Sequence, residues 1–332
     1  MTGARTTRLL AAALTTAVLV GGCGDDATDA PSQLQQQRTQ ESVPTVFWLD
    51  VSEDAVYRAT GPDFEAERIV ADTDPGPDGV AVDPEDGVVY WTSMGLTWTE
   101  GYEPDHEGGT LQTASLEGSG VRRIVEPGTT VVPKQLQLDA EHGHLYWADR
   151  EGATVWRSQL DGTGAEALVT GHALNEVVGI ALDPEQGRVY FSDRIAKRVY
   201  RTAMELPAGQ TAADRTDLEL VLEVQGAAQP VDLAVDPDER RLYWTDRFNG
   251  TVSRAGLDLP AGESPQDRSD VEVVVDRLNE PIGLSVDTVD DRLYYGTLGG
   301  RVGQAGLDGS DDRKVTGSGS VTGVTVVHLP PG

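Results

Sequence analysis

The sequence is poor in cysteine and in basic residues. One Cys occurs among 332 residues, and 26 Lys and Arg stand against 55 Asp and Glu, for a formal net charge of −29. One thiol permits no disulfide within the chain, so a large core must hold the fold together. The negative charge argues against nucleic acid as a partner and against electrostatic docking to anionic lipid.

Motifs of common enzyme classes are missing as well. The chain has no G-x-S-x-G turn, no cysteine nucleophile and no phosphate-binding Gly loop with Lys, and its five His lack zinc-ligand spacing. Because these motifs are missing, the sequence identifies no catalytic residue. Gly is frequent and helix-favouring apolar runs are scarce, which indicates a turn-rich all-β protein.

The N-terminus resembles a bacterial lipoprotein signal. Two Arg precede an apolar run over residues 9–20, which is too short to span a bilayer as a stable helix. The run leads into Gly21-Gly22-Cys23, and in such signals the Cys becomes the lipidated first residue after cleavage. We therefore expect residues 1–22 to be removed. The alternative is a plain secretory signal with an incidental Cys.

The segment that follows predicts a tether. Residues 23–44 are rich in Asp, Ala, Ser and Gln and contain little apolar surface. A lipid on Cys23 and a flexible segment behind it would hold the remaining domain, residues 45–332, on the extracytoplasmic side of the cell membrane. The membrane would then be contacted only through the lipid anchor.

An aromatic pair recurs six times in residues 45–332. Successive copies start 43 to 56 residues apart, which is a period typical of propeller blades. The copies are Phe47-Trp48-Leu49-Asp50, Tyr90-Trp91-Thr92-Ser93, Tyr146-Trp147-Ala148-Asp149, Tyr190-Phe191-Ser192-Asp193, Tyr243-Trp244-Thr245-Asp246 and Tyr294-Tyr295-Gly296-Thr297. Because side chains alternate across a strand, the two aromatics of a pair should fill the spaces on both sides of their blade.

A second motif precedes five of the six pairs. It is a short apolar strand that ends in Asp, and this Asp always lies seven residues before the first aromatic. The strand missing before Phe47 has a match in Gly323-Val324-Thr325-Val326 near the C-terminus. We therefore predict an all-β, six-bladed β-propeller of four-stranded antiparallel blades, whose ring is closed by the C-terminal strand.

These motifs resemble the low-density-lipoprotein-receptor class B (YWTD) repeat. The best copy is Tyr243-Trp244-Thr245-Asp246, preceded by Leu233-Ala234-Val235-Asp236. The likeness extends over nearly the whole of residues 45–329 and implies a six-bladed propeller that binds proteins or supports neighbouring modules. Ser93 and Thr297 depart from the repeat, because they replace its last Asp. No cysteine-rich companion modules occur, so the receptor role does not follow.

One blade carries an insertion on the rim. The second aromatic pair is separated from its next strand by 21 residues, whereas the third needs only nine. The added segment contains Trp98, Tyr102 and His106. An aromatic loop on a regular scaffold is a candidate recognition element. The alternative is a loop that folds over the blade edge with Trp98 as its own small core.

Basic side chains recur beside this rim. Arg150, Arg194 and Arg247 follow the aromatic motif in three successive blades, with Lys197 and Phe248 close by. Three aligned Arg in an acidic protein would form an anion-attracting patch. They would equally serve as ion-pair partners of neighbouring carboxylates, and the sequence leaves both interpretations open.

Oxygen-bearing side chains gather at the expected starts of the inner strands. They are Asp78, Asn175, Glu176, Asn279 and Glu280. Such groups could bind Ca²⁺ at the channel mouth, although repeated turn chemistry explains them too. Two functions follow. The first is a lipid-anchored binding or scaffold propeller for a protein, peptide or glycan, without a cofactor. The alternative is a metal-dependent hydrolase or lyase of the propeller-lactonase type, which rests on fold analogy.

Overall fold

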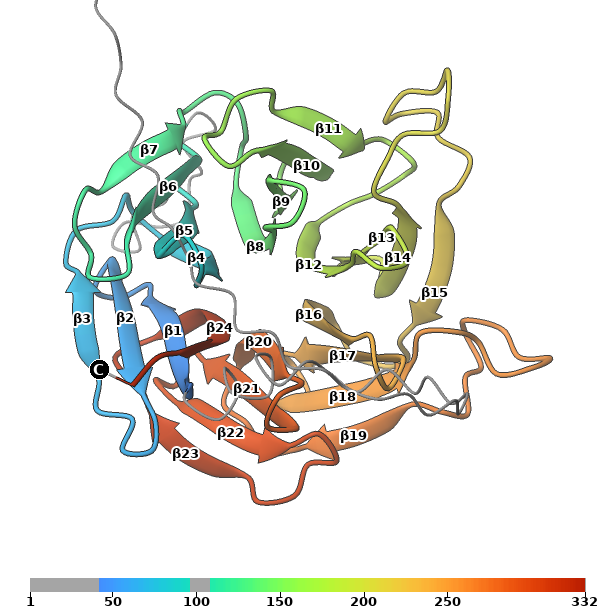
Figure 1. Ribbon diagram of the computed structural model, residues 1–332. Helices are drawn as coiled ribbons and strands as arrows, with labels where there is room; N and C mark the ends of the chain where they lie inside the picture. The colour runs from blue at the N-terminus through green and yellow to red at the C-terminus, as the bar shows by residue number, and fades with distance from the viewer. Residues whose placement is uncertain (1–41, 96–107, 332) are drawn as a thin grey trace, which may run out of the picture. The chain divides into compact units, whose positions relative to one another are not determined.

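The protein is described by a computed structural model that covers residues 42–95 and 108–331. Six antiparallel sheets of four strands each follow one another around a ring (Figure 1). The predicted all-β propeller of six blades is therefore confirmed. In the described part of the chain, no helix has the length and apolar character needed to cross a membrane.

The blades are called A to F, and their strands are given from the channel outward. Blade A has β24 (Val321–Leu329), β1 (Val43–Asp50), β2 (Ala55–Thr60) and β3 (Glu67–Val70); blade B has β4 (Pro77–Asp83), β5 (Val88–Ser93), β6 (Thr110–Ser115) and β7 (Arg122–Val125); blade C has β8 (Pro133–Asp139), β9 (His144–Asp149), β10 (Thr154–Gln159) and β11 (Glu166–Val169).

The second half of the ring repeats the same order. Blade D has β12 (Val177–Asp183), β13 (Arg188–Asp193), β14 (Arg198–Ala203) and β15 (Glu219–Glu223); blade E has β16 (Pro230–Asp236), β17 (Arg241–Asp246), β18 (Thr251–Gly256) and β19 (Glu272–Val275); blade F has β20 (Pro281–Asp287), β21 (Arg292–Thr297), β22 (Val302–Gly306) and β23 (Arg313–Thr316).

The aromatic pairs fill all six spaces between blades. In each space, the first aromatic of one blade shares a buried cluster with the second aromatic of the next blade. The six pairs are Phe47 with Trp91, Tyr90 with Trp147, Tyr146 with Phe191, Tyr190 with Trp244, Tyr243 with Tyr295, and Tyr294 with Trp48. Burial of one such side chain contributes about 1.5–3 kcal/mol, so this repeated contact is the main stabilising contact between blades.

The blades approach one another most closely at the inner strands. A Cβ on Gly179 of β12 would lie 2.1 Å from the carbonyl oxygen of Val231 on β16. A Cβ on Gly283 of β20 would lie 2.2 Å from the carbonyl oxygen of Thr322 on β24. Only glycine allows backbones to come this close, which explains the small residues at the predicted inner strands.

The ring closes as the sequence predicted. Strand β24 pairs antiparallel with β1, with Val324 opposite Trp48 and Thr325 opposite Phe47. The last strand of the chain therefore supplies the inner strand of the first blade and pairs the edge of β1 that would otherwise be free.

The Asp after the aromatic pair has a structural role, as expected. Asp149 at the end of β9 accepts the N–H groups of Val131 and Val132 at 2.8 and 2.9 Å. Asp193 at the end of β13 accepts those of Asn175 and Glu176 at 2.8 and 3.3 Å. Each carboxylate thus ties the start of an inner strand to the end of its neighbour.

Candidate functional site

Four of the predicted site residues lie outside the described residues. They are Cys23 in the N-terminal segment and Trp98, Tyr102 and His106 in the insertion of blade B. Lipidation and loop recognition therefore stay predictions.

The predicted arginines are engaged in ion pairs. Arg194 pairs with Glu176, and its Nη1 also donates to Oε1 of Gln229 in blade E at 2.7 Å. Arg247 binds Oε1 of Glu280 in blade F at 2.7 and 2.9 Å. The two sets of candidate residues, basic and metal-binding, are thus partners of each other. This arrangement matches the ion-pair interpretation of the sequence.

The remaining arginine of that set makes a local contact. Nε of Arg150 donates to Oε1 of its neighbour Glu151 at 2.8 Å. Lys197 takes a left-handed backbone conformation, and its ammonium donates to the carbonyl oxygen of Gly226. Phe248 differs from all of these because 62% of its surface is exposed.

The three carboxylates among the predicted metal ligands have other partners in the described residues. Among the described residues, Asp78, Glu176 and Glu280 belong to no group of three carboxylate or imidazole ligands. Asp78 is buried and pairs with Lys134 and with the side chain of Gln135.

The two predicted asparagines also make local contacts. The side chain of Asn175 donates to Asp193 at 3.2 Å, and the carbonyl of Asn279 accepts the N–H of Gly299 at 3.4 Å. These are the turn contacts that the sequence offered as the alternative to a metal site.

A buried carboxyl in the channel was not predicted. Asp232 of β16 occupies the place where four other inner strands have Gly, and it lines a cavity of about 120 Å³. Its oxygens accept the N–H of Leu233 at 2.8 Å and the N–H of Leu284 in blade F at 2.9 Å. Burial raises the pKa of this carboxyl well above its ordinary value. The side chain braces two inner strands.

A groove of about 430 Å³ lies between blades D and E, and we call it the D–E groove. Its lining comes from the end of β15, the loop after it, strands β17 to β19 of blade E and the two loops that join these strands. Trp244 of β17 and Ser253 of β18 lie at its floor, while Val271 and Val273 line the outer wall. The lining is mostly apolar, with Asn249, Gln225 and other polar groups between.

The groove lies where the third strand offers a small side chain opposite the second aromatic. In three blades, the second aromatic of the pair stacks on an aromatic directly opposite on the third strand: Trp48 on Tyr57, Trp147 on Trp156, and Phe191 on Tyr200. The other three blades have no ring at this place: Gln112 stands opposite Trp91, Gly303 opposite Tyr295, and Ser253 opposite Trp244. The small side chain of Ser253 leaves open the volume that a ring fills in the three stacked blades.

The indole of Trp244 differs in a second way. The indole N–H groups of Trp48, Trp91 and Trp147 donate to side-chain oxygens at 3.0, 2.8 and 3.3 Å. Within the described residues, the indole N–H of Trp244 has no such acceptor. A ligand in the groove could therefore receive a hydrogen bond there as well as apolar contact.

An insertion folds back to wall the groove. The loop between β18 and β19 places Pro265 so that its carbonyl accepts the N–H of Glu223 at 2.9 Å. Arg268, almost fully buried, anchors this loop by donating to the carbonyls of Gly256 and Val221 and to Asp270. The guanidinium of Arg268 holds the pKa of Asp270 below its ordinary value.

Exposed apolar side chains are frequent in blade E. Seven large hydrophobic residues of the described chain are exposed, and four of them belong to blade E: Phe248, Leu259, Val271 and Val273. Two of the four line the groove itself. Because apolar surface gathered in one place marks interaction sites, this sector is the best candidate for binding. A serine in place of the aromatic at residue 253 was the sequence signal.

Comparisons with known proteins agree with this architecture. No protein-family model matches the sequence. The chain is 34% identical over 244 residues to "Low-density lipoprotein receptor-related protein 1" of Pyricularia oryzae, which covers 68% of this chain and 76% of that protein. It is 33% identical over 259 residues to "3-hydroxyacyl-CoA dehydrogenase-like protein LAM1" of Cochliobolus heterostrophus, covering 71% of this chain. The chain spans only 52% of the length of that second relative.

Solved structures show the same fold. The propeller in a crystal structure of a nidogen/laminin complex superposes with a TM-score of 0.66 at 20% identity, covering 86% of this chain and 98% of that one. A gluconolactonase from Xanthomonas campestris superposes with a TM-score of 0.56 at 14% identity, covering 86% of this chain and 82% of that one. At these identities the likeness concerns the fold alone.

Proposed function

Because the chain belongs to the YWTD β-propeller family of the low-density-lipoprotein-receptor-related proteins, we propose that it is an extracytoplasmic, lipid-anchored binding propeller. Its partner is a protein, and the contact is made at the D–E groove. The observation that carries this proposal is the groove over Trp244 and Ser253, with the exposed Phe248 in the same β17–β18 loop that supplies Asn249 to the lining.

The groove suits a particular kind of segment. Its floor is an indole and its outer wall consists of valines, so a bulky aromatic or aliphatic side chain would bury apolar surface there. The side-chain carbonyls of Asn249 and Gln225, whose amide groups donate within the chain, and the indole N–H of Trp244 can form hydrogen bonds to a peptide backbone. An extended protein segment with one apolar anchor residue meets both requirements.

The test uses a substitution, Ser253→Tyr, whose side chain would fill the groove. Peptides are selected from a random displayed library on the purified protein, and their affinities are then compared between Ser253→Tyr and Ser253→Ala. We expect the selected peptides to carry a large apolar residue and to lose about tenfold or more in affinity for Ser253→Tyr. Ser253→Ala leaves the groove open and should bind like the wild type. Equal binding to both variants would refute the groove as the site.

The lipid anchor is tested separately. The gene is expressed in a bacterium that is fed a clickable fatty acid. We expect label and membrane association in the wild-type chain and neither in Cys23→Ser, because Cys23 is the one thiol of the sequence. Label that persists in Cys23→Ser would contradict the anchor and would leave the groove proposal untouched.

The hydrolase alternative gains nothing from the described residues. Glu176 and Glu280 are occupied by Arg194 and Arg247, and Asp78 by Lys134. A calcium titration followed by thermal melting addresses it directly. We expect millimolar Ca²⁺ to change the melting temperature of the Asp78→Asn variant by the same amount as that of the wild type.

A further inference from the structure

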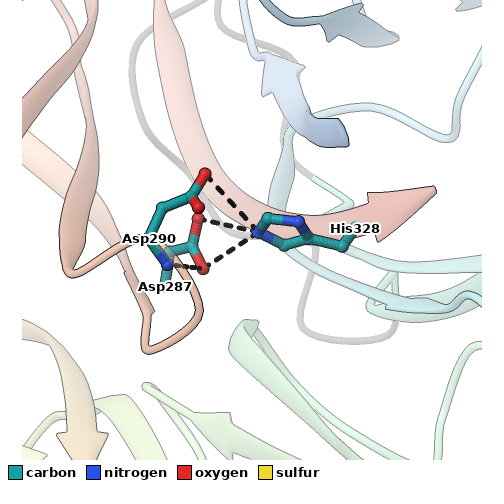
Figure 2. Close-up of side chains that lie close together, drawn as sticks. All are labelled: Asp287, Asp290 and His328. Atoms are coloured by element: carbon teal, nitrogen blue, oxygen red, sulfur yellow. Dashed lines mark hydrogen bonds and ion pairs between the residues drawn. The ribbon is translucent and has the colours of Figure 1, made fainter. Parts of the chain in front are cut away.

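Three ligand-type side chains meet where the ring closes. His328 of β24 belongs to blade A, whereas Asp287 at the end of β20 and Asp290 in the turn after it belong to blade F. Figure 2 shows the imidazole of His328 facing both carboxylates. Nε2 of His328 lies 3.1 and 3.0 Å from the two oxygens of Asp287 and 4.0 Å from Oδ2 of Asp290.

We propose that Asp287, Asp290 and His328 form a binding site for a divalent transition-metal ion of the Zn²⁺ type, which latches the closing strand to blade F. This inference is independent of the D–E groove. The site has one imidazole and two carboxylates, a donor set that suits Zn²⁺ rather than the all-oxygen sites of Ca²⁺.

The distances fit such an ion. With metal–ligand bonds of about 2.1 Å in tetrahedral geometry, two ligand atoms stand about 3.4 Å apart. The separations of 3.0 to 4.0 Å between Nε2 of His328 and the carboxylate oxygens lie on either side of this value, and all three ligand atoms lie within 4.8 Å of one another. The side chain of Asp290 is half exposed, at 48%, so it can rotate by the small amount required, and water can take the fourth position.

The main ligand is held in place by its own turn. Oδ1 of Asp287 accepts the N–H of Val289 at 3.0 Å and the N–H of Asp290 at 3.3 Å. These bonds orient the carboxylate toward His328, as supporting contacts do in metal sites. Nδ1 of His328 is buried without a hydrogen-bond partner among the described residues. The ring is therefore positioned through Nε2 and the carboxylates alone.

One ligand of the site faces an acidic depression. Asp290 lines a surface depression of about 660 Å³ between blades E and F. Its other charged lining residues are Glu239, Asp291, Asp308 and Asp311 and the three arginines Arg241, Arg254 and Arg292, so carboxylates outnumber guanidinium groups five to three. This excess of negative charge would raise the local concentration of cations.

Blade C offers a matched control. There, Nδ1 of His142 lies 3.0 Å from both oxygens of Asp139, which is the equivalent closing Asp of that blade. Within the described chain, no third ligand joins this pair, whereas Asp290 joins the pair in blade F. The two blades therefore compare a His–Asp pair with a His–Asp–Asp site.

The experiment titrates the purified full chain carrying Cys23→Ser, so that no thiol competes for the metal. Zn²⁺ binding is measured by isothermal titration calorimetry and by thermal melting. We expect one ion per chain and a higher melting temperature, because a ligand that binds only the folded state stabilises it. His328→Gln should abolish both effects, and His142→Gln should change neither.

Asp290→Asn is a second test of the site, in a variant that is expected to fold normally. Its side chain lies half exposed in a turn, so the ring should assemble while Zn²⁺ affinity falls by about tenfold or more. Absence of Zn²⁺ binding by the starting chain would overturn the proposal. So would undiminished binding by His328→Gln, or loss of binding in His142→Gln.

Discussion

Blades D and E carry the same kind of insertion and anchoring arginine, but they differ in the residue that packs against the second aromatic of the repeat. Both carry an insertion between their third and fourth strands, Leu206-Pro207-Ala208-Gly209 in one and Leu259-Pro260-Ala261-Gly262 in the other. Both insertions are anchored by a buried arginine, Arg215 or Arg268, with side-chain exposures of 0% and 1%. In blade D the ring of Tyr200 stacks on Phe191, with centroids 5.5 Å apart, but in blade E Ser253 stands opposite Trp244, which lines the groove although only 2% of its surface is exposed.

The difference teaches how a repeat acquires a site. The backbone, the loop and the anchoring arginine are the same in both blades, so none of them distinguishes a closed space from an open one. The two blades differ at the third-strand residue opposite the second aromatic, Tyr200 or Ser253, and interiors are packed closely enough that a missing ring beside a folded-back insertion leaves a groove. Each prediction below perturbs one element of this comparison.

The largest effect is expected from the anchoring arginines. Arg215→Ala and Arg268→Ala should each lower the free energy of unfolding by roughly 3 kcal/mol, because a buried charge partner and several carbonyl bonds are lost together. Urea unfolding measures this loss. Under folded conditions, only Arg268→Ala should also weaken groove peptides, since Arg215 holds the wall of another blade. A stability unchanged in both variants would contradict the anchoring role.

The next effect comes from exchanging the residue that decides the groove. Tyr200→Ser removes a stacked ring and should cost about 2 kcal/mol of unfolding free energy. Ser253→Tyr enters an open groove and should cost less than about 1 kcal/mol. Tyr200→Phe, which keeps the ring, is the control. If Ser253→Tyr proved the more damaging of the two, the groove would not have room for a ring.

Substitution of Phe248 should affect peptide binding without affecting the stability of the fold. Because 62% of its surface is exposed, Phe248→Ala should change the unfolding free energy by less than about 0.5 kcal/mol. We expect the affinity of groove peptides to fall by about tenfold, as measured by calorimetry. The control is Val289→Ala, which truncates an exposed apolar residue in blade F and should leave the affinity of groove peptides unchanged. Equal effects of both variants would remove Phe248 from the site.

The smallest effect concerns acid stability. Arg215 and Arg268 lower the pKa of Asp217 and Asp270, respectively. A carboxyl whose pKa is depressed in the folded state stabilises the protein above its unfolded pKa, and this contribution is lost as the pH falls through the folded pKa. Asp217→Asn and Asp270→Asn should therefore flatten the acid side of the stability curve, from about pH 5 to pH 2. Asp238→Asn, at an exposed position, serves as the control, and an acid limb as steep as in the wild type would contradict the linkage.

The fold could be predicted because its determinants are local and repeated. The aromatic pairs, the closing Asp and the C-terminal match at Val324 all appear in the sequence at constant spacing, and each has the place that the spacing implied. The candidate site was harder. Arg194 and Glu176 were named for two different purposes, and only their distance reveals one ion pair. Loop recognition by Trp98, Tyr102 and His106 remains a prediction outside the described residues.

By itself, the sequence determined six blades, the strand that closes them and the alternation that buries both aromatics of each pair. These follow from periodicity, since a side chain two residues along a strand returns to the same face. The tertiary structure decided what lies between blades and across the closure. The D–E groove depends on how an insertion of blade E folds against β15, and the meeting of His328 with Asp287 depends on ring closure. Contacts between residues far apart in the chain have no period, so only the assembled ring reveals them.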